Sequence, residues 1–235
     1  MTGAARLAAR AARRVGAGLL TIAAPSEALD IYRSGDAGVI VTEDQPFEAV
    51  LADGRRNALL LGPGGGAGEA LAGKVLAALA TGRSCVLDAD ALTSFAERAE
   101  PLFAALSDKV VLTPHDGEFQ RLFGAVEGSR LERAREGARR SGAVLLLKGP
   151  DTVVAHPSGK AVITTTAPPE LATAGSGDVL AGLILGLLAQ GMTAFDAANA
   201  AAWLHGQAAR AVGKGVIADD LADALPRVLA GSAFR

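Results

Sequence analysis

The chain has 235 residues, of which 50% are hydrophobic and 20% are charged, and this size suits one domain with a substantial core. Its 23 basic and 25 acidic side chains nearly cancel, so small molecules or proteins are better expected partners than nucleic acid or a membrane surface. The single cysteine, Cys85, excludes an internal disulfide and favours a cytoplasmic location, although a periplasmic protein without disulfides would have the same composition. No apolar run reaches the ~18 residues of a membrane-spanning helix.

Segments of two kinds alternate from the N-terminus to Lys148. Short β-rich runs without period-two alternation occupy 18–24, 37–42, 58–62, 84–90, 109–114 and 143–149. Helical periodicity is present near 4–15, 67–81, 91–105, 116–124 and 129–141. Strands that are buried on both faces lack alternation. The pattern therefore predicts an α/β fold with a central, mostly parallel sheet that helices cover on both faces.

The alternation of β-rich and helical segments ends after Lys148. The segment TVVAHPSGKAVITTT, 152–166, holds two short β runs around a turn and predicts a late β-hairpin. Two long helices, near 177–190 and 194–212, are expected to close the domain. Because there is no internal repeat or low-complexity linker, residues 1–235 are expected to form a single domain.

The stretch ATAGSGDVLAG, 172–182, places glycines and a lone carboxylate directly before an apolar helix. Glycines let backbone amides approach a ligand, and the first amides of a helix lack partners, so a phosphate fits there. Asp178 has two interpretations that spacing does not separate: a helix cap, or a base that takes the proton of a substrate hydroxyl as it attacks a phosphoryl group. The turn indicates phosphoryl transfer to an alcohol without identifying the alcohol.

Several motifs together resemble one family. The turn TAGSGDVLAG (173–182) is similar to the anion-hole and base motif of the ribokinase-like superfamily, and LTPHDGEFQRLFG (112–124) narrows the resemblance to the NAD(P)H-hydrate dehydratases. Further blocks in the family's order are LGPGGG (61–66), VLDADAL (86–92), LLLKGPDTVV (145–154) and AAWLHGQAA (201–209). The resemblance covers nearly the whole chain and implies a ribokinase-like fold.

The resemblance implies an enzyme that uses a nucleotide to phosphorylate the hydroxyl of the (6S)-hydrate of NADH or NADPH. Phosphate then leaves and the nicotinamide double bond re-forms, so the net reaction is a dehydration by a lyase that repairs the cofactor. ADP is the expected donor, with ATP as the other, and Mg²⁺ is expected with the polyphosphate although no protein metal cage is visible in the sequence. A homo-oligomer, often a tetramer, is also implied.

The resemblance assigns roles to individual residues. Asp178 activates the hydroxyl and contacts the substrate. The anion hole is assigned to Ala174, Gly175, Ser176 and Gly177. Nucleotide binding is assigned to Lys148, Gly149, Pro150, Asp151, Thr152 and Gly177, and hydrate binding to Ala4, Gly64, Gly66 and His115. No residue is assigned to a metal.

Some of these positions have plainer interpretations. KGPD (148–151) could be an ordinary turn after a strand, and His115 an ordinary surface or capping residue. Asp116 and Glu118 are expected to cap the following helix or orient the loop, without a catalytic role.

Three further positions keep open roles. Asp88 and Asp90, at a strand end, either gather a cation or cap the next helix. His205, with its neighbour Trp203, is expected to pack in the core.

The opening of the chain departs from the family pattern. Relatives usually begin with an additional strand and a glycine-rich turn before the segment that resembles residues 2–20, so we expect the first strand of the sheet to be missing. Because an unpaired sheet edge favours association, we expect lower stability than in an N-terminally extended version. The alternatives for function are a kinase of the same superfamily that acts on a vitamin precursor such as hydroxyethylthiazole, and a non-catalytic nucleotide-binding domain.

Overall fold

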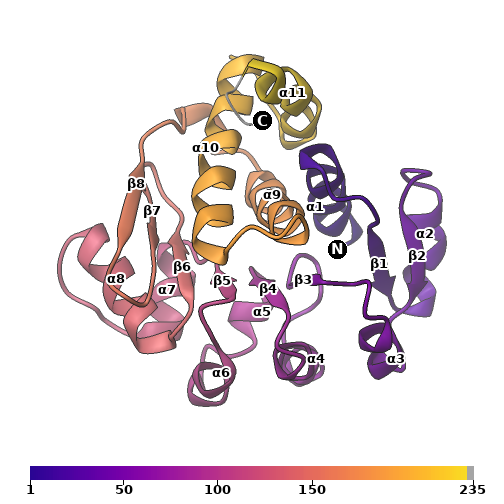
Figure 1. Cartoon of the computed structure of the whole chain (residues 1–235), viewed down its shortest axis with the longest axis horizontal. Coiled ribbons are helices and arrows are strands. Elements are labelled where there is room, and N and C mark those ends of the chain that lie inside the picture. The colour runs from indigo at the N-terminus through magenta and orange to yellow at the C-terminus, as the bar shows by residue number, and fades with distance from the viewer. Residues whose placement is uncertain (232–235) are drawn as a thin grey trace.

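The computed structural model describes residues 1–231, and its central element is a six-stranded sheet (Figure 1). The strands follow in chain order across the sheet: β3 (Ala58–Leu61), β4 (Ser84–Leu87), β5 (Val110–Leu112), β6 (Val144–Leu147), β7 (Thr152–Ala155) and β8 (Ala161–Thr164). Strands β3 to β6 are parallel, whereas β7 and β8 form an antiparallel hairpin. The mostly parallel sheet and the late hairpin are confirmed.

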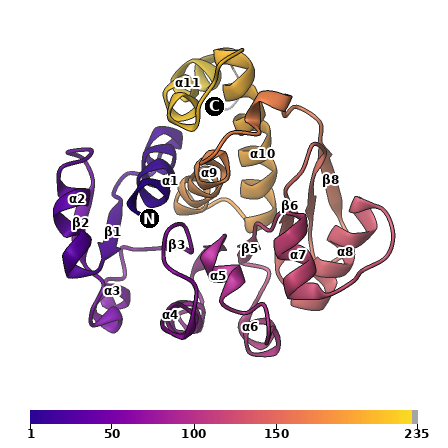
Figure 2. The ribbon, with the colours of Figure 1, turned by 180° about the vertical axis from the view of Figure 1, so that it is seen from behind.

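Helices cover both faces of this sheet, as Figure 1 and the view from behind in Figure 2 show. One layer contains α1 (Thr2–Val15), α9 (Ser176–Ala189), α10 (Ala194–Val212) and α11 (Ala218–Gly231), and the other contains α4 (Glu69–Ala80), α5 (Asp90–Thr93), α6 (Glu100–Ala105), α7 (Asp116–Phe123) and α8 (Arg130–Ser141). Val86 packs with the first layer, whereas its neighbours Cys85 and Leu87 pack with the second. Because both faces of the parallel part of the sheet are covered, the sequences of β3 to β6 are almost entirely apolar.

Two of the predicted strands lie outside this sheet, which corrects the expectation of one sheet for all six runs. β1 (Thr21–Ala24) and β2 (Ile40–Glu43) form their own parallel sheet, accompanied by η1 (Ser26–Ala28), α2 (Leu29–Arg33) and α3 (Phe47–Ala52) (Figure 1). A cavity of about 440 Å³ lies between β1 and β3, with largely apolar walls. The sequence pattern cannot foresee this separation, because it depends on which strand edges meet rather than on the local alternation.

The helices also correct two expectations. The helix predicted over 91–105 is divided into α5 and α6, and Pro101 lies in the first turn of α6, where proline favours a helix start. A third long helix, α11, follows the two that were expected to close the domain; it buries Leu221 and Leu225, while Pro226 obscures its helical pattern. Within residues 1–231, no helix combines the length and the apolar character needed to cross a membrane.

Helix α9 packs on α1 through glycines. An added Cβ at Gly182 would lie 2.2 Å from the Ala8 carbonyl oxygen, and one at Gly186 would lie 2.4 Å from Val15 Cγ1. The two helices therefore approach each other closely enough for α1 backbone to touch α9. This contact fixes α9 and the turn that precedes it.

We expect Gly182→Ala to lower the free energy of unfolding by about 1–3 kcal/mol, because its methyl group must displace the α1 backbone. Gly73→Ala is the matched control: Gly73 is exposed in α4, and nothing lies within 4 Å of an added Cβ. Alanine at that position should raise the free energy of unfolding by about 0.5–1 kcal/mol. Urea unfolding measures both variants, and equal stabilities would contradict the α1–α9 contact.

Candidate active site

The predicted site residues gather at the carboxyl edge of the parallel strands, where open α/β sheets bind ligands. Asp88 follows β4 and Lys148 follows β6, and the Lys148 N–H donates to the Pro114 carbonyl at 2.9 Å. The N-terminus of α9, which carries Asp178, lies at the same edge. An added Cβ on Gly177 would be 3.6 Å from Lys148 Nζ.

The glycine-rich turn enters α9 without a side-chain cap. Gly175 has a φ of 86°, in the left-handed region that favours glycine. Ser176 is held by its hydroxyl, which donates to the Leu171 carbonyl at 2.8 Å in η2 (Pro169–Leu171), and by its N–H, which donates to the Thr173 carbonyl at 3.3 Å. Because no described side chain caps α9, the cap interpretation of Asp178 is not supported, and the helix end can receive an anion.

Asp178 lies half-buried in the first turn of α9. Burial, together with the Asp88 and Asp90 carboxylates, raises the pKa of its carboxyl to about 6, although Lys148 acts in the opposite direction. A carboxyl with this pKa is largely ionised at neutral pH and yet holds a proton more readily than an ordinary aspartate. These are the properties of a general base that works near pH 7.

Lys148 is enclosed by carboxylates. Its Nζ donates to Asp88 Oδ1 at 2.8 Å and lies 3.7 Å from Glu118 Oε2. Burial by itself would lower the pKa of this ammonium, but Asp88, Glu118 and Asp178 outweigh burial and raise it. Lys148 therefore remains a cation beside the glycine-rich turn.

The Asp88 and Asp90 side chains both have direct partners within the protein, which neither interpretation of the sequence anticipated. Asp88 is only 2% exposed and pairs with Lys148. Asp90 Oδ2 accepts a hydrogen bond from the Gly66 N–H at 2.9 Å and so supports the LGPGGG turn. In the part of the chain that the structure describes, no group of three or more acidic, histidine or cysteine side chains is arranged to hold a metal ion.

His115 begins α7 as its N-cap. Its Nδ1 accepts hydrogen bonds from the N–H groups of Gly117 and Glu118 at 2.9 and 3.3 Å, and Glu118 Oε2 accepts from the His115 N–H at 2.9 Å. The expected capping role of Glu118 is confirmed by this reciprocal pair. The His115 side chain remains 52% exposed at the site, so a substrate contact stays a prediction.

The predicted hydrate-binding residues at the other side of the site come from the LGPGGG turn and α1. Gly64 and Gly66 have φ values of 68° and 77°, and the Gly64 carbonyl accepts a hydrogen bond from the Met1 ammonium at 3.2 Å. Ala4 lies in the first turns of α1 and is 8% exposed, so its side chain offers little surface to a ligand. Contacts of these residues with a substrate remain predictions.

His205 and Trp203 lie in and against the core, as expected. Burial lowers the pKa of His205 to about 4, although a hydrogen bond with the Ser176 backbone acts in the opposite direction. His205 is therefore neutral and lies under the glycine-rich turn.

The sequence profile of the NAD(P)H-hydrate dehydratases matches residues 1–228. The chain belongs to this family. It is 40% identical to the bifunctional NAD(P)H-hydrate repair enzyme of Salinibacter ruber, over 97% of this chain and 46% of that protein. It is also 40% identical to the ADP-dependent (S)-NAD(P)H-hydrate dehydratase of Neisseria meningitidis, over 72% of this chain and 61% of that protein.

A crystal structure gives the same result for the fold. The ADP/ATP-dependent NAD(P)H-hydrate dehydratase from Bacillus subtilis, co-crystallised with ATP and Mg²⁺, has a TM-score of 0.82 and 30% identity, over 98% of this chain and 85% of that one. The ribokinase-like fold is confirmed. The chain spans about half the length of the bifunctional relatives that it matches.

In this member of the dehydratase family, one arginine organises the predicted nucleotide-binding segment. Arg130, the first residue of α8, donates to the Lys148 carbonyl at 3.0 Å and to Asp116 Oδ2 at 2.7 Å, and its Nε lies 3.0 Å from Asp151 Oδ1. Its guanidinium packs against Gly149, where an added Cβ would be 2.6 Å away. The segment continues through Pro150 to Thr152, whose hydroxyl donates to the Gly149 carbonyl at 3.1 Å.

Arg130 was not predicted to belong to the site, because the sequence of α8 is typical of an arginine-rich helix that faces solvent. Ser129 and Glu132, which form the capping box that begins this helix, are the local signal that could have placed Arg130 at a helix start beside the site.

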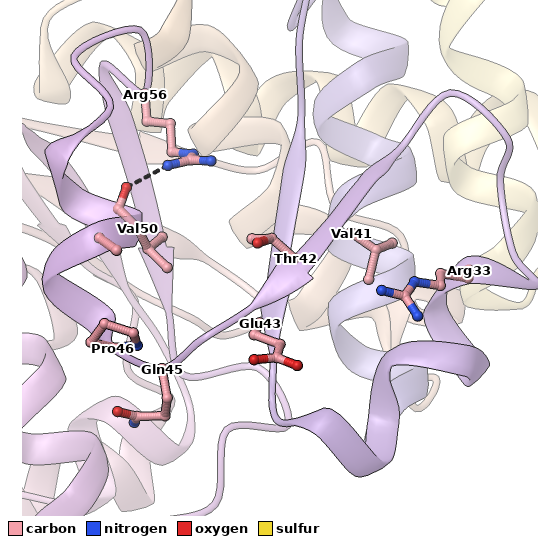
Figure 3. Close-up of a pocket in the computed structure, with 9 residues that line it drawn as sticks. Arg33, Val41, Thr42, Glu43, Gln45, Pro46, Val50 and Arg56 are labelled. Carbon is pink, nitrogen blue, oxygen red and sulfur yellow. Dashed lines mark hydrogen bonds between the residues drawn. The ribbon is translucent and has the colours of Figure 1, made fainter.

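A second hollow, of about 440 Å³, lies on the two-stranded sheet and is shown in Figure 3. Side chains of Arg33, Thr42, Glu43 and Arg56 line it, and the Arg56 guanidinium donates to the Val50 carbonyl. None of the residues that line it is among the predicted dehydratase residues.

Proposed function

We propose that the chain is a nucleotide-dependent NAD(P)H-hydrate dehydratase that restores NADH or NADPH from the (6S)-hydrate. The observation that carries the proposal is Asp178, a carboxyl with a raised pKa at the open N-terminus of α9, beside the buried Lys148 ammonium, in a chain that matches the dehydratase family over residues 1–228. The kinase alternative is not favoured, because the matched relatives are named as hydrate repair enzymes.

The proposed chemistry begins with transfer of the terminal phosphoryl group of the nucleotide to the hydroxyl of the hydrate. Asp178 accepts the hydroxyl proton as the oxygen attacks phosphorus, and the bond between phosphorus and the bridging oxygen of the nucleotide breaks. Backbone amides at the N-terminus of α9 and the Lys148 ammonium stabilise charge on the phosphoryl oxygens. Phosphate then leaves with the electrons of the carbon–oxygen bond, and loss of a ring proton restores the double bond.

Mg²⁺ is proposed to arrive on the phosphates of the nucleotide rather than in a protein cage. Asp88 and Glu118 are already engaged with Lys148 and the His115 backbone, and the described residues offer no metal-binding cluster. An ion carried by the nucleotide would neutralise polyphosphate charge beside the acidic groups at this edge. The names of the Neisseria and Bacillus relatives support ADP as the donor, with ATP as the other.

We also propose that the protein works in the cytoplasm as a homo-oligomer, with a tetramer as the expected form. The resemblance to the family supports this assignment. Light scattering on the purified chain tests the assembly, and a monomer at micromolar concentration would contradict it.

The test of the function is recovery of reduced-nicotinamide absorbance from hydrated NADH, with Mg²⁺ and ADP, ATP or no nucleotide. We expect recovery that requires a nucleotide and releases phosphate. A stable phosphorylated alcohol would favour the kinase alternative. Flat absorbance with a nucleotide bound would favour a non-catalytic binding domain.

Arg130→Gln is expected to raise the nucleotide KM by about tenfold with little change in kcat, because the substitution releases the backbone of the nucleotide-binding segment rather than a group that reacts. Arg139→Gln is the matched control, since Arg139 lies on the same helix and is exposed in a pair with Glu136. Steady-state kinetics with varied nucleotide separate the two variants. A fall in kcat with an unchanged KM would contradict the role given to Arg130.

A further inference from the structure

Asp88 follows strand β4 and Lys148 follows strand β6, and these two strands are not neighbours, because β5 lies between them. The Lys148, Asp88 and Glu118 side chains are 20%, 2% and 9% exposed, so the ammonium and its two carboxylates share a nearly dry space. Taking such charges out of water is unfavourable unless they are paired in good geometry. The 2.8 Å bond from Lys148 Nζ to Asp88 Oδ1 supplies that geometry.

The backbone around Asp88 is also constrained. Its carbonyl lies against Gly62, where an added Cβ would be 1.7 Å away. The next residue, Ala89, has a φ of 47°, a conformation that non-glycine residues adopt only where the surroundings impose it. With this backbone, Asp88 pairs with Lys148 while Asp90 binds the LGPGGG turn. Local strain of this kind is concentrated at functional sites.

We propose that Asp88 is a positioning residue that holds the Lys148 ammonium beside Gly177, with Glu118 as a second support, so that the ammonium meets the transferring phosphoryl group without first having to be ordered. This inference rests on the proposed function. A lysine has a long flexible stem, and charge that is already fixed in place stabilises a transition state better than charge that must reorganise. Asp88 therefore acts through Lys148 and does not itself touch the reacting atoms.

The charges around the site give this role a distinctive signature. Asp178 is faced by Asp88 after β4, Asp90 of α5 and Lys148 after β6, and Lys148 is faced in turn by Glu118 of α7. Removal of the Asp88 carboxylate takes away a negative neighbour of Asp178 and frees the ammonium to approach it. Both changes favour the ionised form of Asp178. The acid limb of the pH–rate profile should therefore move to lower pH even as kcat falls.

The test compares Asp88→Asn, Lys148→Gln and the double variant in the hydrate assay. We expect Asp88→Asn to lower kcat by about 10²-fold, the usual effect of one charge-stabilising group, with the nucleotide KM unchanged or lower because a negative charge has been removed. In the Lys148→Gln background, Asp88→Asn should cause less than about a twofold further loss, because residues that act as one unit are not additive. Additive losses, or an unchanged kcat and pH profile, would overturn the proposal.

Asp44→Asn is the matched control, since Asp44 forms a similar, mostly buried pair with Lys74 outside the site. It should lose stability without changing kcat or the acid limb. If Asp88→Asn does not fold, the double variant, which removes both members of the Lys148–Asp88 pair, still decides: a kcat equal to that of Lys148→Gln supports the proposal, and a much lower kcat overturns it.

A crystal structure of Asp88→Asn keeps this proposal separate from the proposed function. If wild-type protein restores no absorbance, the dehydratase function fails, yet the position of Lys148 Nζ can still be observed. An ammonium displaced from Gly177 supports positioning by Asp88. An ammonium that stays beside Gly177 overturns it.

Discussion

Asp178→Asn is expected to lower kcat by about 10²–10⁴-fold, the usual contribution of a positioned general base. Asparagine keeps the size and polarity of the side chain but cannot accept the hydroxyl proton. Nucleotide affinity should stay within about threefold of wild type, because the proposed ligands of the phosphates are the backbone amides of the turn and Lys148, not this carboxylate. The absorbance assay measures turnover, and calorimetry with ADP measures binding.

Asp196→Asn is the control for this variant. Asp196 also lies in the first turn of a helix, α10, where its carboxylate is hydrogen-bonded to Thr193 Oγ1 at 2.7 Å. It should retain wild-type kcat. If Asp178→Asn kept more than about a tenth of the wild-type kcat, the base would have to be another group.

The same substitution should stabilise the fold at high pH. The pKa of Asp178 is raised from 3.8 to about 6 in the folded state, so the folded chain holds this proton more tightly than the unfolded chain does. Ionisation therefore lowers stability as the pH rises between these values, and the loss is complete above about pH 6. Allowing for solvent screening of a half-buried group, Asp178→Asn should exceed wild type by about 1–2 kcal/mol at about pH 8 and show no gain below about pH 4.

Urea unfolding at the two pH values measures this gain. A variant that is less stable than wild type at both would show that the Asp178 carboxylate supports the fold. A gain at the higher pH combined with lost turnover would indicate that function is maintained at the expense of stability.

The main sheet could be predicted from the sequence, because strands buried on both faces carry their signal locally. Val86 and its neighbours Cys85 and Leu87 face opposite cores and are all fully buried. The separation of β1 and β2 from that sheet could not be predicted, since Thr21–Ala24 has the same apolar character as strands of the main sheet. Strand choice between two sheets depends on packing with distant segments rather than on alternation.

The candidate site likewise has a part that could be predicted from the sequence and a part that could not. The glycine-rich turn and Asp178 are adjacent in sequence, so their proximity in the site could be predicted. The pairing of Asp88 with Lys148 joins residues that are 60 positions apart, and no local pattern contains it. Arg130 was missed for the same reason, because its partners Asp116 and Asp151 lie on either side of it at long separations in the chain.

The pH–rate profile should have an acid limb with a midpoint near the raised pKa of Asp178, about 6. The base must be ionised before it can accept the hydroxyl proton, so kcat/KM should fall by about tenfold for each pH unit below the midpoint. The assay with ADP in excess, run across the acid range, measures the limb. A profile without an acid limb in this range would contradict the assignment of Asp178 as the base.

Two further variants test whether the neighbouring charges set this midpoint. Asp90 raises the pKa of Asp178 and Lys148 lowers it, so Asp90→Asn should move the limb to lower pH and Lys148→Gln should move it to higher pH. Glu136→Gln, at an exposed carboxylate on α8, should leave it unchanged. A general loss of stability would move the acid limbs of both site variants in the same direction. Shifts of opposite sign therefore require a titrating group that is close to both charges. Asp178 is such a group, because Asp90 raises its pKa and Lys148 lowers it.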